Sequence, residues 1–262
     1  MSKEYRNYLK KKKRNKFLVF FFQLLILVGI IFIWEFLAQK ELINTFIYSS
    51  PNRILDTIIG LHESNDLYNH IWITIYETFI SFSLGTIIGI IIAIILWYSK
   101  FLYKIIDPYL TIINSLPKVS LGPIIIIIFG ANIKSIIIMS LLISVIITTI
   151  NVYKGFNETD VNKINLLKSF NATKVQIFRY IVLPSSYSTI ISSLKINVSM
   201  SLIGVIMGEL LVSKEGIGYL IMYGSQVFNL NLVISGVIIL MIVSYLMYLI
   251  VSYIEKILIK NG

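Results

Sequence analysis

The sequence contains no cysteine, only two histidines and few charged residues for its length. Without cysteine the chain can form no disulfide and offers no thiolate as a nucleophile or metal ligand. Both histidines, His62 and His70, fall in one short polar segment, which argues against a histidine-rich metal site.

Nucleotide-binding and catalytic motifs are also absent from the sequence. There is no G-x-x-x-x-G-K-[ST], so the chain has no P-loop with which to bind ATP by itself. Neither His-x-x-x-His nor G-x-S-x-G occurs, and no polar cluster suited to catalysis can be located. We therefore expect no enzymatic activity, cofactor or metal. If ATP drives a process here, another polypeptide must hydrolyse it.

Long apolar runs dominate what is present. Of 262 residues, 56% are hydrophobic and 14% charged, with a mean hydropathy of +0.83, whereas soluble domains carry about 25% charged residues. The sequence predicts an all-α integral membrane protein with a basic cytoplasmic N-terminus, 1–16, and one transmembrane domain, 17–262. Its six expected spans lie at about 17–38, 71–97, 105–129, 135–152, 188–212 and 232–254.

Proline marks two features of this plan. Pro108, Pro117 and Pro123 all fall in the third apolar run, and we expect each to interrupt that span. The connection at 39–70 is polar, with a turn expected at Ser50–Pro51–Asn52, and 213–231 is expected to be a short polar loop.

The net charge of +10 is distributed unevenly along the chain. With six spans, 17 of the 23 Lys and Arg residues lie on the side of the two termini, four lie on the other side, and two fall within spans. Basic residues concentrate on cytoplasmic loops. We therefore expect a multi-pass protein of the cell membrane with both termini cytoplasmic. The charge then reflects orientation and contact with anionic lipid, and nucleic acid is not expected as a partner.

One polar, basic stretch, 159–184, lies between the fourth and fifth spans. It begins with apolar residues at every third position, which predict one face of a short helix capped by Thr159 or Asp160. These apolar residues are Val161, Ile164, Leu167 and Phe170. On the six-span plan the stretch is cytoplasmic.

A second short helix is expected directly after a turn. Asn171 stands where the first helix would end, and asparagine tolerates the left-handed conformation that such an ending requires. Thr173 and Gln176 have the spacing of a capping box, so the second helix should begin at Lys174. Pro184 disfavours helical geometry before it and is expected to close that helix. Two short helices joined by a fixed bend favour a docking element over an ordinary loop.

Ionisable residues within spans are costly and therefore informative. Lys195 can extend to the cytoplasmic surface, and Glu209 lies near the outer end of span five, where solvation explains it about as well as function. Lys118 follows Pro117 deep in the third run, and either a solute path or a structural ion pair would account for it.

Small residues recur in two of the spans. Gly85 and Gly89, and again Gly204 and Gly208, form G-x-x-x-G pairs that let helices approach closely. Serines, Ser199 among them, make the fifth span suited to packing against a helix or lining a wet cavity. The candidate residues for a translocation path or gate are Pro117, Lys118, Ser199 and Glu209.

The stretch 159–184 resembles the signature of binding-protein-dependent ABC importer permeases, which reads E-A-A, three residues, Gly, nine residues and I-x-L-P. Asn165 begins the triplet, Asn171 takes the Gly position, and Ile181, Leu183 and Pro184 follow at the matching spacing. Further short matches occur in order along most of the chain, and together they are most similar to the nitrate/sulfonate/taurine branch. These matches are Ser50–Pro51, Asp107–Pro108, Leu116–Pro117, Gly122–Pro123, Phe129–Gly130, Ala172–Thr173, Gly208–Glu209 and Glu215–Gly218.

This resemblance implies a type I importer permease for a small polar or anionic solute, such as a sulfonate, nitrate, taurine or a thiamine precursor. It implies three partners: an ABC ATPase homodimer, an extracytoplasmic substrate-binding protein and a second copy of the permease, all at a lipid bilayer. The residues that it assigns to ATPase coupling are Asn165, Leu166, Leu167, Phe170, Asn171, Ala172, Thr173, Gln176, Phe178 and Pro184.

The chain departs from the family pattern at three positions. Asn165 replaces the triplet's Glu, a charge that helps the ATPase interface in relatives; Asn171 replaces Gly; and Glu77 stands where the branch usually has Arg. An ATP-independent channel or secondary transporter, and a membrane enzyme, are the alternative readings.

Overall fold

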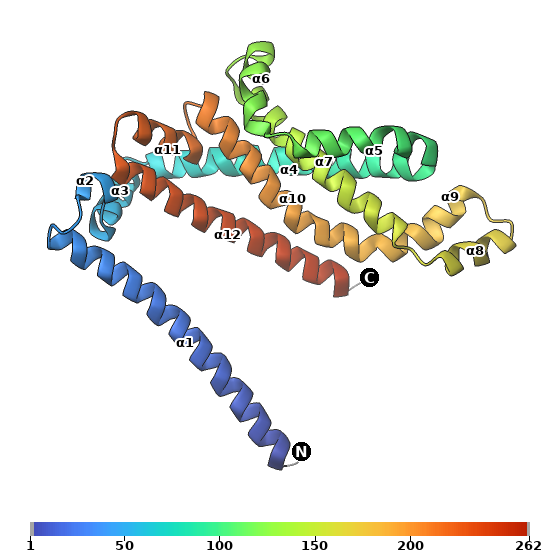
Figure 1. The fold of residues 1–262 in the computed structure, drawn as a ribbon, viewed down its shortest axis with the longest axis horizontal. Helices are drawn as coiled ribbons and strands as arrows, with labels where there is room; N and C mark the ends of the chain where they lie inside the picture. The colour runs from blue at the N-terminus through green and yellow to red at the C-terminus, as the bar shows by residue number, and fades with distance from the viewer. Residues whose placement is uncertain (1–2, 261–262) are drawn as a thin grey trace.

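The computed structural model describes residues 3–260, and all the regular structure in that part of the chain is helical (Figure 1). Five described helices are long and apolar enough to cross a membrane. They are α1 (Lys3–Gln39), α4 (Asp66–Tyr98), α7 (Ile133–Asn157), α10 (Leu183–Val212) and α12 (Leu230–Lys260). A sixth crossing is made if the bent pair α5 (Lys100–Ser115) and η1–α6 (Lys118–Leu121 and Gly122–Phe129) counts as one span. The all-α membrane architecture is therefore confirmed.

The centre of the molecule is formed by α4, α7 and α10, which pack along one another. Glycine makes their close approach possible. A Cβ atom placed on Gly89 of α4 would lie only 2.6 Å from Thr148 Cβ of α7, and one placed on Gly204 of α10 would meet the backbone of Ser140. Both expected G-x-x-x-G pairs thus lie at helix crossings, and any larger residue there would push the helices apart.

The long helix α1 lies apart from this centre (Figure 1). It packs chiefly against α3 (Pro51–Glu63) near its own C-terminal end, and its large apolar side chains, such as Phe17 and Phe32, are exposed. Since nothing in the described chain covers them, these side chains form a surface suited to lipid.

The connections at 39–70 and 213–231, which were expected to be polar loops, contain helices that the sequence did not predict. In 39–70, Ser50 caps α3 by accepting a hydrogen bond from the Arg53 N–H, and Pro51 occupies the first turn. The Ser–Pro pair therefore starts a helix and is more than a turn. A further short helix, α2 (Thr45–Tyr48), precedes it, and α11 (Ile217–Gln226) occupies the loop expected at 213–231.

Only one of the three prolines of the third run breaks its helix. Pro108 lies inside α5, so the interruption expected there was wrong. At Pro117 the chain does turn, and the two flanking segments are bent by 93°. The last backbone hydrogen bond of α5 joins the Leu116 N–H to the Ile112 carbonyl at 3.1 Å, and Pro117 has no N–H to continue the series. Pro123 lies in the first turn of α6, where no N–H is needed.

Candidate functional site

The stretch 159–184 is built as two short helices around a fixed turn. Asp160 caps α8 (Val161–Ser169) by accepting a hydrogen bond of 2.8 Å from the Asn162 N–H. Asn171 then has the expected left-handed backbone, with φ of 56°. The Ala172 N–H returns to the Leu167 carbonyl at 3.0 Å, which closes the end of α8.

The second helix of this element, α9 (Lys174–Ile177), begins at the expected residue. The Gln176 N–H donates to Thr173 Oγ1 at 3.3 Å, and the Thr173 N–H donates to Gln176 Oε1 at 2.7 Å. This reciprocal pair is the predicted capping box. Since every turn residue has a local partner, the bend between α8 and α9 is fixed by its own sequence.

Pro184 does not close the second helix, contrary to the expectation. The chain continues from α9 through a π-helical turn, η2 (Phe178–Val182), into α10, and Leu183 is helical with φ −62° and ψ −48°. The Leu183 N–H bonds back five residues to the Phe178 carbonyl, and this wider turn accommodates a proline that has no N–H. The helix–turn–helix element is therefore a direct extension of the fifth span.

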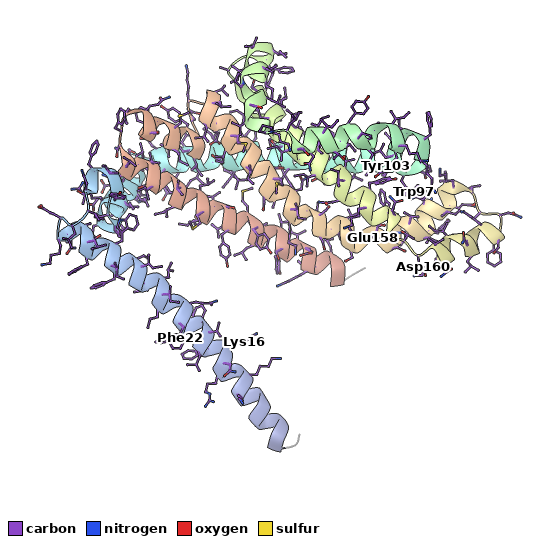
Figure 2. The ribbon with its side chains drawn as sticks, in the orientation of Figure 1. Lys16, Phe22, Trp97, Tyr103, Glu158 and Asp160 are labelled. Carbon is purple, nitrogen blue, oxygen red and sulfur yellow. The ribbon has the colours of Figure 1, made fainter. Side chains whose placement is uncertain are left out.

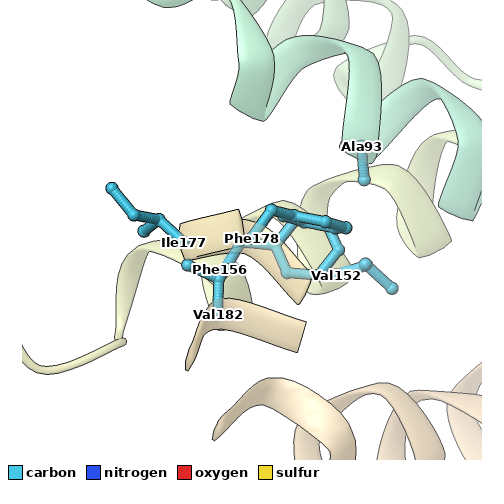
Figure 3. Packing of buried hydrophobic residues seen from close by; sticks show 6 residues of the cluster. All are labelled: Ala93, Val152, Phe156, Ile177, Phe178 and Val182. Carbon is cyan, nitrogen blue, oxygen red and sulfur yellow. The ribbon is translucent and has the colours of Figure 1, made fainter. Parts of the chain in front are cut away.

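Aromatic packing fixes the element to the helical body. The Phe178 ring lies 5.0 Å from that of Trp97, 5.4 Å from Tyr98 and 5.3 Å from Phe156, measured between centroids. Figure 3 shows Phe178 and Phe156 at the centre of a buried cluster, whose members come from α4, α7, α9 and η2. The other members of this cluster are Ala93, Val152, Ile177 and Val182.

The ten predicted coupling residues divide into an inner and an outer group. Phe178 is buried, and Leu167 and Ala172 pack against the same apolar cluster. The exposed residues include Leu166 at 59% and Phe170 at 73% of their surface. The remaining residues, Asn165, Asn171, Thr173, Gln176 and Pro184, are also exposed.

Only part of the predicted α8 face points inward. Ile164 and Leu167 pack on the body, whereas Val161 and Phe170 are exposed. Residues three apart rotate by about 300° around an α-helix, so the stripe drifts by about 60° at each step. Val161 and Phe170, at the two ends of the stripe, therefore face away from the apolar cluster that Ile164 and Leu167 contact.

A buried polar cluster lies at the opposite ends of α4 and α10. Glu209 is 1% exposed, so the solvated position considered for it was wrong. Its carboxyl accepts a hydrogen bond of 2.7 Å from Thr74 Oγ1 and one of 2.6 Å from the Gly218 N–H. We call His70, Thr74, Glu77 and Glu209 the carboxyl cluster.

This cluster caps the start of α11. The Gly216 N–H donates to His70 Nδ1 at 2.9 Å, and the Ile217 N–H donates to Thr74 Oγ1 at 2.9 Å. Together with the Gly218 N–H, these are the donors that a helix start leaves without partners. Gly216 has φ of 100°, and a Cβ there would lie 2.5 Å from Glu209 Oε1, so only glycine fits.

Glu77 places a second carboxyl in the same site. It is 2% exposed, interacts with Glu209 through its side chain, and has one buried oxygen, Oε2, without a hydrogen-bond partner. Two carboxyl groups facing each other away from water need a shared proton or a cation between them. Glu77 therefore adds a second acid to the cluster at a position where the resemblance led us to expect Arg, and the sequence alone did not connect it with Glu209.

The four path candidates lie in separate surroundings. At the bend, Pro117 is exposed and Lys118 donates from Nζ to the Asn114 carbonyl in the last turn of α5. Lys118 makes no ion pair with the described residues. Ser199 lines an apolar hollow of about 490 Å³ between α10 and α12, while Glu209 lies in the carboxyl cluster.

Lys195 is held by a partner and does not simply extend to the surface. Its Nζ lies 2.7 Å from Glu255 Oε2, and Ser192 Oγ donates to Glu255 Oε1 at 3.0 Å. The ion pair links α10 to α12 near the end that carries the helix–turn–helix element.

Comparisons with known proteins agree on one kind of protein. Residues 85–260 match the family described as binding-protein-dependent transport system inner membrane component. A Bacillus subtilis (strain 168) permease protein named for the transport of aliphatic sulfonates is 27% identical over 90% of this chain and 86% of its own length. The formylaminopyrimidine transport permease protein of Halalkalibacterium halodurans is 28% identical over 71% of this chain and 74% of its own length.

A solved structure shows the same fold. One chain of the MetNI methionine ABC transporter, in an inward-facing conformation, superposes with a TM-score of 0.66 at 19% identity. The match covers 75% of this chain and 97% of that chain.

Proposed function

Since the chain belongs to the family of binding-protein-dependent transport system inner membrane components, we propose that it is the membrane-spanning permease of an ATP-driven importer whose ATPase subunits are separate polypeptides. The sequence has no P-loop of its own, so energy must arrive from outside the chain. The observation that carries this proposal is the helix–turn–helix element, with Leu166 and Phe170 exposed at its outer side and Phe178 fixed in the body.

In this account the element transmits force. Leu166 and Phe170, with the exposed polar residues Asn165 and Gln176, form the surface that docks on the ATPase. Because α9 continues through η2 into α10, movement of the docked tip is passed to the fifth span as a rigid-body displacement. The bend at Asn171 keeps α8 at a constant angle to the continuous segment formed by α9, η2 and α10.

The remaining features of the assembly follow from this function. A second copy of the permease completes the path, an extracytoplasmic binding protein delivers the solute, and both termini and the element face the cytoplasm. The bias of Lys and Arg toward the side of the termini supports this orientation. The residues 17–262 act as one transmembrane domain.

The solute is a small polar or anionic molecule. The names of the relatives support this class, since they refer to aliphatic sulfonates and to formylaminopyrimidine. On this proposal the bend at Pro117, with Lys118 beside it, Ser199 and Glu209 contribute to the path or its gate.

Co-purification tests the proposal. The tagged chain, extracted from its own membranes in mild detergent, should retain a P-loop ATPase identified by mass spectrometry. The double substitution Leu166→Glu and Phe170→Glu should remove that ATPase without loss of membrane insertion. A Val161→Glu substitution, equally exposed at the start of α8, is the matched control and should retain it. Retention of the ATPase by the double variant would contradict the docking surface.

The carboxyl cluster favours one second candidate, a proton-coupled secondary transporter. Buried carboxyl pairs within a membrane can carry protons. Uptake measured with a protonophore and an ATP supply kept constant decides between the two: uptake should persist for an ATP-driven importer and cease for a proton-coupled one.

A further inference from the structure

A pocket of about 280 Å³ lies between α8 and the adjoining ends of α4, α5 and α7. Figure 2 labels Trp97 at this end of the molecule, together with Glu158 and Asp160 where α7 leads into α8. The pocket joins the helix–turn–helix element to the rest of the molecule; Leu166 and Phe170 do not line it, and Asn165 is the one residue that it shares with the proposed docking surface. Its lining residues include Trp97, Tyr153, Thr159, Asn165 and three lysines.

The charge of this pocket is of one sign. Lys100, Lys168 and Lys174 line it, and no Asp or Glu is among the lining residues. Two acids flank Thr159 in the sequence without lining the pocket: Glu158 lies 3.9 Å from Lys154 Nζ, and Asp160 caps α8. Asn165 also lines the pocket and adds no charge to it.

Polar groups in the lining are left without protein partners. Thr159 is 5% exposed, and its Oγ1 is buried with no hydrogen bond. Such an orphaned hydroxyl is costly unless a ligand or water satisfies it. Lys174 is already oriented, because its Nζ donates to the Tyr98 carbonyl and lies 5.8 Å from the centroid of the Trp97 ring. Its other N–H groups remain available to an anion.

We propose that this pocket binds a phosphate group through Lys100, Lys168, Lys174 and the hydroxyl of Thr159. Lysine binds phosphate as a point charge, and a hydroxyl can donate to a phosphate oxygen. Ligand pockets usually enclose about 300–1,000 Å³. This volume therefore suits inorganic phosphate or a single lipid headgroup, and it is too small for a nucleotide.

Two sources of phosphate share this chemistry. Tryptophan and tyrosine are typical of the level of lipid headgroups, and Trp97 and Tyr153 line the pocket, so an anionic lipid could supply the group. Inorganic phosphate is the other source. The lipid route rests on the proposed cytoplasmic orientation, whereas binding of inorganic phosphate does not. In both cases the ligand bridges α8 and the body, and it restricts movement of the helix–turn–helix element relative to the body.

Fluorescence of Trp97 provides the test. In full-length chain carrying Trp34→Phe and Trp72→Phe, Trp97 is the only tryptophan. The chain is titrated with inorganic phosphate in neutral detergent, against sodium chloride of equal ionic strength. It is also titrated with phosphatidylglycerol in phosphatidylcholine nanodiscs. A saturable change in at least one series is expected. If the tryptophan variants do not fold, native mass spectrometry of the unaltered chain counts bound phosphate and retained phosphatidylglycerol instead.

Matched variants separate a built site from general attraction to positive charge. The double substitution Lys100→Gln and Lys168→Gln should raise the half-saturating concentration at least tenfold. The pair Lys104→Gln and Lys163→Gln removes the same charge from the same two helices outside the pocket and should leave it unchanged. A response to phosphate alone identifies the free ion, and a response to phosphatidylglycerol alone identifies a lipid site. No saturable response, or equal weakening in both double variants, would overturn the inference. Since binding is measured without an ATPase, that failure would leave the importer proposal standing.

Discussion

The bundle of α4, α7 and α10 holds two short helices at one end and one at the other, and the contacts that hold them differ in chemistry. At one end, α8 and α9 are fixed by the rings of Trp97, Phe156 and Phe178. At the other end, α11 is fixed by hydrogen bonds from its first N–H groups to His70, Thr74 and Glu209. Apolar contacts have no preferred direction, whereas a buried carboxyl destabilises the fold unless each of its hydrogen-bond partners is in place.

This difference suggests different tasks. At the aromatic end, the helix–turn–helix element can move as one rigid body when the ATPase displaces its exposed residues, since close-packed side chains transmit displacement. The polar end depends on a few hydrogen bonds. Because the Glu77 side chain interacts with Glu209, the strength of those bonds depends on whether the two carboxyl groups are charged. Substitutions at the two ends should therefore have different consequences.

The largest effect is expected at the aromatic end. Phe178→Ala removes the ring at the centre of the cluster and should lower the free energy of unfolding by about 3–5 kcal/mol. Phe170→Ala is the control, because that ring is 73% exposed, and it should change stability by no more than about 0.5 kcal/mol. Reversible denaturation in mixed micelles measures both. Similar losses in the two variants would show that Phe178 does not anchor the element.

At the polar end, Glu209→Gln should cost about 1–3 kcal/mol, because the amide has one acceptor oxygen in place of the two that accept from Thr74 Oγ1 and the Gly218 N–H. Glu77→Gln should cost less than about 1 kcal/mol, since Glu77 Oε2 has no partner to lose and the amide NH2 can donate to Glu209 without a shared proton. The same denaturation assay ranks the pair, and the reverse order would contradict this assignment of the hydrogen bonds.

The turn at the polar end should tolerate no side chain. Gly216→Ala places a Cβ against the Glu209 carboxyl at a φ of 100° and should cost about 1–3 kcal/mol. Gly60→Ala, in a helix with open space around the glycine, is the control and should be neutral or stabilising. Protease resistance of the loop at 213–216 reports the same loss locally, and an unchanged loop in Gly216→Ala would contradict the tight fit.

The smallest loss of stability, but a large loss of transport, is expected at the other turn. Asn171→Val forces a β-branched residue into the left-handed region at a cost of about 1–2 kcal/mol. Asn171→Gly suits the same φ and should preserve both stability and uptake. In vesicles reconstituted with the ATPase and the binding protein, the complex that contains the valine variant should still hydrolyse ATP but show little uptake. Normal uptake in that variant would show that the fixed bend is not needed for coupling.

Local signals made one end of the molecule predictable. The capping box at Thr173, the turn at Asn171 and the start at Lys174 all depend on residues within a few positions, and all three predictions were confirmed. The prediction that Pro184 ends the second helix was wrong, because the π-helical turn before it lets the helix continue. The identity of the neighbouring residues alone does not predict such a turn. The docking role of the exposed residues stays a prediction.

The other end could not be found in this way. Thr74 and Glu209 are 135 residues apart, and Gly216 and His70 are 146 apart, so no spacing rule relates them. Lys195 and Glu255 met across helices for the same reason. The sequence contained two short matches to the family pattern in this region, Gly208–Glu209 and the Glu215–Gly218 run. The structure explains them together, because the loop at Gly216 and Gly218 wraps around the Glu209 carboxyl.

Single-cysteine cross-linking to the ATPase tests the central claim most directly, because the chain has no cysteine of its own. With the ATPase co-expressed, a photoactivatable thiol reagent on Phe170→Cys should yield a covalent permease–ATPase adduct. The same reagent on Lys214→Cys, at the other end of α10, should yield none. Absence of the adduct from position 170, or labelling of that position by an impermeant thiol reagent added outside intact cells, would contradict the account.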